Sequence, residues 1–248
     1  MRILFISDLH TTMIENAQFE WLNQIIIETR PDLLLSAGDW DEGLTRNSIQ
    51  PILEKIPLLT IFGNHENMQE LTQIIAPSLG RSALLQDFEV VEVCGLKICG
   101  VNGIYSEKRL MKKGVPRQRG DSFIIKARNF LEETQTSLYS IDFFLCHETP
   151  ELPVYSSNEL ECFKFRISKG SKLIMDTINL IKPKIVLNGH LHFTEYTLTR
   201  MDYGGLYIRV DSSEKSRSFA VIELDGERYS VGIHKESVEN LLEKKWQV

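Results

Sequence analysis

The chain has 248 residues, of which 42% are hydrophobic, and a formal net charge of −6. This composition supplies enough apolar material for a globular core, and it argues against a disordered or strongly basic protein. The sequence has no apolar run of membrane-spanning length, and its N-terminal apolar stretch is interpreted as a strand rather than a signal peptide. The four cysteines include no Cys-x-x-Cys pair, which favours reduced thiols and a cytoplasmic location.

The first half of the chain predicts alternating strands and helices. Apolar runs of strand length begin at Ile3, Leu33 and Leu58. Between them, apolar residues recur at the spacing of a helix, and Pro31 ends the first helical segment. The helical positions are Phe19, Leu22 and Ile26 in the first segment and Ile49, Ile52 and Ile56 in the second.

After residue 86 the sequence predicts mainly strands. Two runs, 88–93 and 96–101, flank Cys94-Gly95, which we interpret as a hairpin turn that leaves Cys94 and Cys99 facing each other. Further strands are expected at 143–146, 185–188, 194–199, 205–210, 218–223 and 228–233.

The C-terminal segment predicts a helix at its end. From Glu236 to Trp246, apolar residues recur at helical intervals. The nearby His234 lies in a polar stretch, and we interpret it as an ordinary surface residue.

Polar side chains that can bind metals directly follow five of the apolar runs. Continuous apolar runs are typical of strands buried on both faces, and ligands of open α/β sheets bind beyond the carboxyl ends of the strands. Side chains at i and i+2 of an extended segment point the same way, so Asp8 is expected to converge with His10, as His190 is with His192. The residues that follow the runs are Asp8, His10, Asp39, Asn64, His65, His147, His190 and His192.

These donor types together predict a site for two metal ions. Neutral imidazole, carboxylate and amide oxygen suit first-row divalent metals. A mixed set of this size exceeds what one four-coordinate ion needs.

The ordered motifs resemble those of the calcineurin-like metallophosphoesterases. The blocks Asp-x-His, Gly-Asp, Gly-Asn-His-Glu, His and Gly-His-x-His all occur, in this order, between residues 8 and 192. The resemblance implies an α/β fold, a four-layer α/β/β/α sandwich of two mixed sheets flanked by helices, in a single domain over residues 1–248. It also implies two ligand sets that share one carboxylate: Asp8, His10, Asp39 and His192 for one ion, and Asp39, Asn64, His147 and His190 for the other.

The implied activity is hydrolysis of phosphate esters, with phosphodiesters favoured, by metal-bound hydroxide. Two ions about 3.5–4 Å apart can activate a shared water and clamp the phosphoryl oxygens. His65 would face the substrate as the general acid, since imidazole titrates near neutral pH. Asn64 would bind a metal through its oxygen and donate through its nitrogen. Manganese is the expected metal, with iron, zinc, nickel and cobalt as alternatives.

Three carboxylates near the motifs are not assigned as metal ligands. After Gly-Asp the chain continues Trp40-Asp41-Glu42-Gly43 without a nearby arginine, which disfavours the protein phosphatase branch of the family. Asp41 could support a metal ligand through a hydrogen bond, but such a residue is more often merely exposed. Glu66 and Glu148 could orient ligand histidines, but loop carboxylates are usually solvated, and we assign them no such role.

A basic segment at 108–119 stands out in this acidic chain. It contains Lys108, Arg109, Lys112, Lys113, Arg117 and Arg119. A charge run is usually a solvated face; the alternative is a loop that recruits phosphate or a nucleic-acid backbone.

Two other functional classes stay open. One is a nuclease of the DNA-repair type that acts on DNA or RNA, although the chain offers only one basic segment. The other is a non-catalytic scaffold, which the intact motif residues disfavour.

Overall fold

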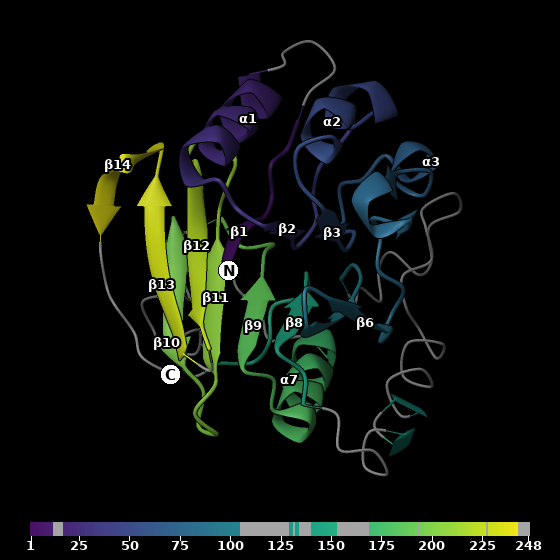
Figure 1. Ribbon diagram of the computed structural model, residues 1–248. Coiled ribbons are helices and arrows are strands. Elements are labelled where there is room, and N and C mark those ends of the chain that lie inside the picture. Colours follow the sequence, from purple (N-terminus) through teal and green to yellow (C-terminus); the bar gives the residue numbers. More distant parts are fainter. Residues whose placement is uncertain are drawn as a thin grey trace.

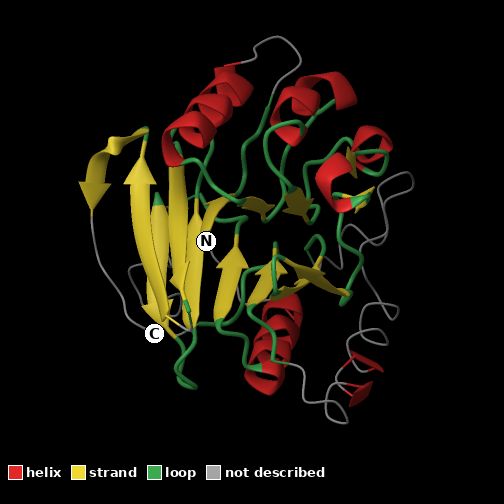
Figure 2. Ribbon diagram, viewed as in Figure 1, coloured by secondary structure: helices red, strands yellow, loops and turns green. Residues whose placement is uncertain are grey.

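A computed structural model describes residues 1–11, 17–104, 129–130, 132–133, 140–152, 169–192, 194–226 and 228–242 of the chain. Over these residues, two six-stranded sheets lie face to face, with helices on their outer sides (Figures 1 and 2). The predicted four-layer α/β/β/α sandwich with two mixed sheets is therefore confirmed.

The first sheet has the strand order β14-β13-β12-β1-β2-β3. Strands β1, β2 and β3 are parallel to one another, and β12 is antiparallel to β1. The strands are β1 (Arg2–Ile6), β2 (Leu33–Ser36), β3 (Leu58–Thr60), β12 (Ser218–Asp225), β13 (Arg228–Lys235) and β14 (Ser237–Leu242).

The second sheet has the order β10-β11-β9-β8-β7-β6, and its four central strands are parallel. Its strands are β6 (Val90–Val93), β7 (Leu96–Val101), β8 (Phe143–Cys146), β9 (Ile185–Asn188), β10 (Tyr196–Arg200) and β11 (Leu206–Val210). A small two-stranded sheet, β4 (Ile75–Ala76) and β5 (Arg81–Ser82), encloses the 3-10 turn Pro77–Leu79.

Helices cover the outer face of each sheet. Helices α1 (Ala17–Thr29), α2 (Arg46–Leu53) and α3 (Met68–Leu71) lie beside the first sheet, and α7 (Lys169–Ile181) lies beside the second (Figure 1). Helix α2 begins at a capping box, in which Thr45 accepts from the backbone N–H of Ser48 and the Ser48 side chain accepts in return. The apolar positions predicted for the first two helices are buried, but Ile56 lies beyond α2, which ends at Leu53.

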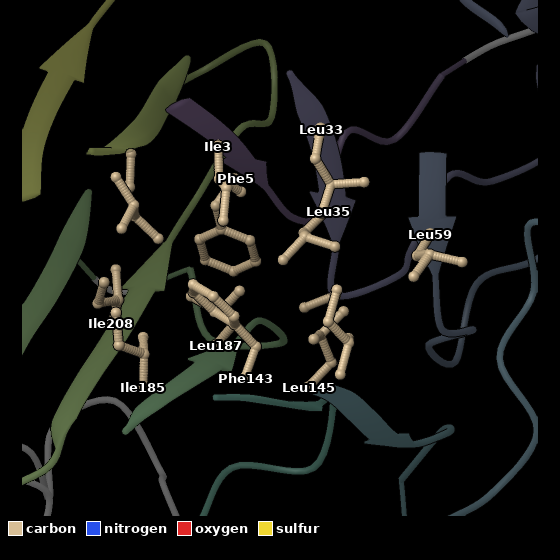
Figure 3. Close-up of a cluster of buried hydrophobic side chains, with 14 of the residues drawn as sticks. Ile3, Phe5, Leu33, Leu35, Leu59, Phe143, Leu145, Ile185, Leu187 and Ile208 are labelled. Carbon is tan, nitrogen blue, oxygen red and sulfur yellow. The ribbon is translucent and has the colours of Figure 1, made fainter. Parts of the chain in front are cut away.

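Alternating side chains of each strand pack on opposite faces. In β1, Ile3 and Phe5 face the second sheet, whereas Leu4 and Ile6 pack beneath the first-sheet helices. Figure 3 shows Ile3 and Phe5 above Phe143 of β8 and Leu187 of β9 in the layer between the sheets. Both faces of the central strands are thus buried, which explains their continuous apolar sequences.

The predicted C-terminal helix is wrong over its described part. Ser237–Leu242 forms β14, which pairs antiparallel with β13. The chain reverses at Glu236, whose φ is 65°, and the backbone carbonyl of Glu236 accepts from the indole Nε1 of Trp21 at 2.8 Å. The sheet edge offered by β13 therefore overrides the helical spacing of the apolar residues. Residues 243–246 lie outside the described residues.

Two smaller predictions are also corrected. Cys94 and Gly95 form the tight turn of the β6–β7 hairpin, with φ values of 54° and 77°, so Cys94 is exposed while the buried Cys99 pairs with Val90. His234 is buried in β13, and its ring stacks on Phe219 with centroids 5.0 Å apart. Among the described residues, no helix is long and apolar enough to cross a membrane.

Truncation of Phe143 tests the inter-sheet core. Phe143 is fully buried, so Phe143→Ala should leave a cavity and lower the free energy of unfolding by about 3–5 kcal/mol, as measured by urea denaturation. Ile27→Ala is the control, because Ile27 is 58% exposed on α1 and its truncation should change stability little. Equal losses in both variants would contradict this account of the core.

Candidate metal centre

The carboxyl ends of strands from both sheets meet at one edge of the sandwich. The backbone N–H of Ser212, beyond β11, donates to the carbonyl of Ser7, beyond β1, at 2.8 Å. The backbone N–H of Gly103, beyond β7, donates to the carbonyl of Phe62, beyond β3, at 2.6 Å. These hydrogen bonds tie the motif-bearing loops that follow β1 and β3 to neighbouring loops of the second sheet.

The motif loops reach this edge through left-handed backbone rather than extended backbone. Strands β1, β2 and β9 end before the motif residues, and φ is 58° at Asp8, 49° at His10, 58° at Asp39 and 74° at His190. The expected convergence of Asp8 with His10 does occur, but the extended i, i+2 geometry that we gave as its reason is wrong. Residues with positive φ are costly unless the surroundings enforce them, and such residues concentrate at functional sites.

One cluster consists of Asp8, His10 and His192, whose ligand atoms lie within 4.8 Å of one another. The Nε2 atoms of His10 and His192 are 3.3 Å apart, and the Nε2 of His192 is 3.6 Å from Oδ1 of Asp8. Asp8 is buried, and its carboxylate also accepts from the Ser7 hydroxyl and from the backbone N–H of His190.

A second cluster consists of Asp8, Asp39 and His147, all buried. Oδ2 of Asp39 is 3.3 Å from Nε2 of His147 and 3.9 Å from Nε2 of His10. Nε2 of His147 is also 3.2 Å from Oδ1 of Asn64.

The remaining predicted ligand and the predicted acid lie beside these clusters. The ring of His190 lies 5.1 Å from that of His147, centroid to centroid, although His190 falls in neither cluster. The exposed ring of His65 lies edge-on to that of His10 at 5.6 Å, and the backbone N–H of His65 donates to Oδ1 of Asp39 at 2.7 Å. The fold thus brings all eight predicted residues to one edge.

The hydrogen bonds of the imidazoles fit a site for cations. Nδ1 of His147 lies 2.7 Å from the carbonyl oxygen of Ala37, which can only accept, so this nitrogen carries the proton. In neutral His147 the lone pair is therefore on Nε2, which faces Asp39. Nδ1 of His10 and Nδ1 of His192 also face oxygen acceptors, which are the carboxylates of Asp41 and Asp211. Lone pairs and carboxylate oxygens converge here, and divalent metals use this donor set.

The buried carboxylates and imidazoles of the cluster shift one another's pKa values. Burial raises the pKa of Asp8, and the neighbouring carboxylate of Asp39 raises it further. Although burial opposes the change, the imidazole of His147 lowers the pKa of Asp39. Burial also opposes protonation of His147, but the carboxylates of Asp39 and Asp8 raise its pKa to about 10. The raised pKa of His147 thus reflects the negative charge of the carboxylates beside it.

Two motif glycines provide room for the carboxylates. A Cβ on Gly63 would lie 2.0 Å from Oδ1 of Asp39, and a Cβ on Gly189 would lie 2.0 Å from the hydroxyl of Ser7 and 2.5 Å from Oδ2 of Asp8. Side chains at these positions would therefore displace the clustered groups.

Glu66 and Glu148 are not the solvated carboxylates that the sequence suggested. Oε1 of Glu66 accepts from the backbone N–H groups of Asp39 at 2.6 Å and Gly63 at 3.0 Å, and Oε2 accepts from that of Trp40 at 3.1 Å. Burial, followed by the charge of Asp39, raises the pKa of Glu66 to about 8. Glu148 is buried and accepts from the hydroxyl of Ser171 at 3.1 Å.

Sequence reasoning missed two residues that support the site. Asp211 directly follows the apolar run of β11, so the rule that pointed to the five motif blocks would have found it too. Asn188, the last residue of β9, donates to the carbonyls of Cys146 and His147, and its own oxygen accepts from the hydroxyl of Tyr207. Asp41, for which the sequence left a supporting role open, lies 3.1 Å from Nδ1 of His10.

Comparison with known proteins identifies the family. The family described as calcineurin-like phosphoesterase matches residues 1–193, so the chain belongs to the calcineurin-like phosphoesterase family. This confirms the predicted resemblance and the predicted class, the hydrolases of phosphate esters. The predicted basic segment, 108–119, lies outside the described residues.

Two curated relatives share part of the chain. The lariat debranching enzyme of Entamoeba histolytica is 27% identical over 155 residues, which cover 56% of this chain and 44% of that protein. The lariat debranching enzyme of Schizosaccharomyces pombe is 31% identical over 171 residues, which cover 58% of this chain and 35% of that protein. The alignments therefore span less than half the length of either relative.

Solved structures share the fold. A protein of Thermus thermophilus superposes with a TM-score of 0.60 at 16% identity, over 93% of this chain and 97% of the other. A dimetal phosphatase from Danio rerio gives a TM-score of 0.60 at 10% identity, over 95% of this chain and 96% of the other. At these identities the similarity establishes the architecture alone.

Substitution of Glu66 tests its structural role. Glu66→Ala removes the acceptor of three backbone N–H groups and should lower the free energy of unfolding by roughly 3 kcal/mol, because each buried unsatisfied donor costs about 1–3 kcal/mol. Glu66→Gln keeps one acceptor oxygen and should lose less. Denaturation of the metal-stripped proteins measures both, with the exposed Glu92→Ala as control. A loss no larger than that of the control would show that Glu66 does not hold these loops.

Proposed function

We propose that the chain is a binuclear metal-dependent phosphoesterase that favours phosphodiesters. The observation that carries the proposal is the position of Oδ2 of Asp39, which lies near Nε2 of both His10 and His147. A carboxylate oxygen between imidazoles of the two clusters is suited to bridge two cations. The family membership and the donor chemistry support the same arrangement.

The proposed ligand sets are those that the family resemblance implies, and the two clusters of donors support them in part. One ion would be held by Asp8, His10, Asp39 and His192, and the other by Asp39, Asn64, His147 and His190. Manganese is the proposed metal. These nitrogen and oxygen donors also accept iron, zinc, nickel and cobalt, and the availability of each metal in the cell decides among them. When bound, two such ions supply Lewis acidity and a water of lowered pKa.

The chain's own residues supply orientation and a proton. The hydrogen bond of the His65 backbone to Asp39 fixes the loop on which the exposed imidazole of His65 sits. That imidazole lies outside both clusters, so it is available to protonate the leaving oxygen of a substrate. The amide of Asn64 can ligate through Oδ1 while its nitrogen donates to an anionic ester.

A nuclease is the second candidate, and the two lariat debranching relatives favour it. Both are similar to this chain over more than half of its length. A substrate of this kind would be a phosphodiester of RNA, consistent with the preference proposed above. Faster cleavage of a branched RNA than of its linear counterpart would select this candidate; equal inertness toward both would reject it.

Replacement of Asp39 tests the bridging role. Asp39→Asn removes the charge of the shared carboxylate, so metal-stripped protein refilled with Mn²⁺ should bind metal poorly and lose hydrolysis of a chromogenic phosphodiester. The matching phosphomonoester, assayed in parallel, measures the preference for diesters. Asp142→Asn serves as control, because Asp142 is a buried carboxylate bound to Lys184 and the backbone of Lys97, outside the two clusters. Full activity of Asp39→Asn would refute the bridging assignment.

Replacement of His65 separates catalysis from metal binding. His65→Ala should retain both ions but reduce kcat by about 10²–10⁴-fold, the usual contribution of a general acid. Metal content measured by atomic emission, together with kcat, distinguishes the two effects. The exposed Gln69→Ala, on α3 close to the same loop, should match the wild type in both. Loss of an ion from His65→Ala would mean that His65 is itself a ligand.

A further inference from the structure

Two of the clustered histidines contact a carboxylate through Nδ1, the ring nitrogen opposite the Nε2 that lies in the cluster. Nδ1 of His10 lies 3.1 Å from Oδ2 of Asp41, and Nδ1 of His192 lies 3.2 Å from Oδ1 of Asp211. Both imidazoles belong to the cluster with Asp8. A carboxylate in this position fixes the tautomer and the ring orientation and makes the opposite nitrogen a better ligand.

His147, in the other cluster, is oriented differently. Its Nδ1 donates to the carbonyl oxygen of Ala37, a neutral acceptor of the backbone. The imidazole ring of His147 is also completely buried, whereas the side chain of His192 is 42% exposed. Packing therefore restrains His147, while His192 depends more on the group behind it.

Asp211 is built to provide that restraint. Its carboxylate is 5% exposed, and its Oδ1 also accepts from the backbone N–H of Ser213 at 3.0 Å. The backbone N–H of Asp211 donates to the carbonyl of Glu195, and its own carbonyl accepts from the N–H of Ser218. Asp211 is thus fixed on both sides before it contacts His192.

Arg209, two residues before Asp211 and on β11, anchors the loop that carries His192. Its guanidinium donates to the carbonyl of Leu191 at 2.5 Å and to the carbonyl of Thr194 at 3.0 Å, on either side of His192. Asp211 directly follows the last residue of this strand. The end of β11 therefore holds both the backbone of this loop, through Arg209, and the imidazole of His192, through Asp211.

We propose that Asp211 is a positioning residue for His192 and acts on only one of the two cation positions, the one formed by Asp8, His10 and His192. The proposal rests on the binuclear function proposed above, but it assigns a role to a residue outside the motifs of that site. Asp41 acts on the same position through His10, more weakly because its side chain is 31% exposed.

Titration of the metal-stripped protein with Mn²⁺ tests the proposal without any turnover measurement. Electron paramagnetic resonance of the free ion gives the affinity of each bound equivalent. Asp211→Ala should weaken one equivalent by about 10–100-fold and leave the other unchanged. Asp211→Asn keeps an oxygen that accepts from Nδ1 and should restore part of this loss. Asp41→Asn should weaken the same equivalent by a smaller factor.

Controls separate positioning from a loss of folding. Asp142→Asn, which alters a buried carboxylate elsewhere, should leave both affinities unchanged, and thermal unfolding of each metal-stripped variant checks that it is folded. Unchanged Mn²⁺ affinities in Asp211→Ala would overturn the positioning role of Asp211. So would an equal loss of affinity for both bound ions in Asp211→Ala and Asp211→Asn. Neither result would by itself reject the binuclear function. A wild-type protein that binds fewer than two ions would overturn the binuclear function together with the role of Asp211.

Discussion

The buried imidazole of His147 is the contact on which the candidate site depends. It follows β8 of the second sheet, yet its Nδ1 donates to Ala37 at the end of β2 in the first sheet, and its Nε2 faces Asp39. One ring therefore links the two sheets at this edge, and in its neutral form its lone pair is on Nε2, which faces the carboxylate. His147 is fully buried and close to Asp39 and Asp8. The packing of the sandwich therefore determines the free-energy cost of burying these ionisable groups together.

The backbone around the site is held in a conformation that it would not adopt alone. Positive φ at a non-glycine residue costs of the order of 1 kcal/mol or more, and Asp8, His10, Asp39 and His190 all have it. Hydrogen bonds between loops offset this cost: the N–H of Asp8 donates to the carbonyl of Gly38, and that of His10 to the carbonyl of Asp39. The strands supply the rigidity, and the left-handed residues turn the side chains inward.

The sequence predicts the central strands and the convergence of the motif residues because both depend on strong local signals, whereas the four-layer sandwich was expected from the family resemblance. Strands buried on both faces read as continuous apolar runs, and polar residues at their ends mark the carboxyl edge. The supporting residues were harder to predict, since a carboxylate such as Glu66 acquires its role only when loops from different strands bring three N–H groups to it. The C-terminal segment was mispredicted for a related reason: the unpaired edge of β13 is a tertiary feature, and it decides between strand and helix for Ser237–Leu242.

Different parts of the structure determine the chemistry of the candidate site and its choice of substrate. Strand ends fix the clustered donors, so the hydrolytic chemistry follows from the architecture and the motif residues. Substrate choice belongs to the segments that surround this edge, because binding residues of such folds lie on loops carried by a rigid scaffold. His192 combines features of the loops and of the rigid strands. Its side chain is half-exposed, but Asp211 contacts its imidazole and Arg209 binds the backbone on either side of it, both from the buried end of β11. The exposed positions of the loop that carries His192 can therefore change in sequence while the imidazole of His192 keeps its position at the site.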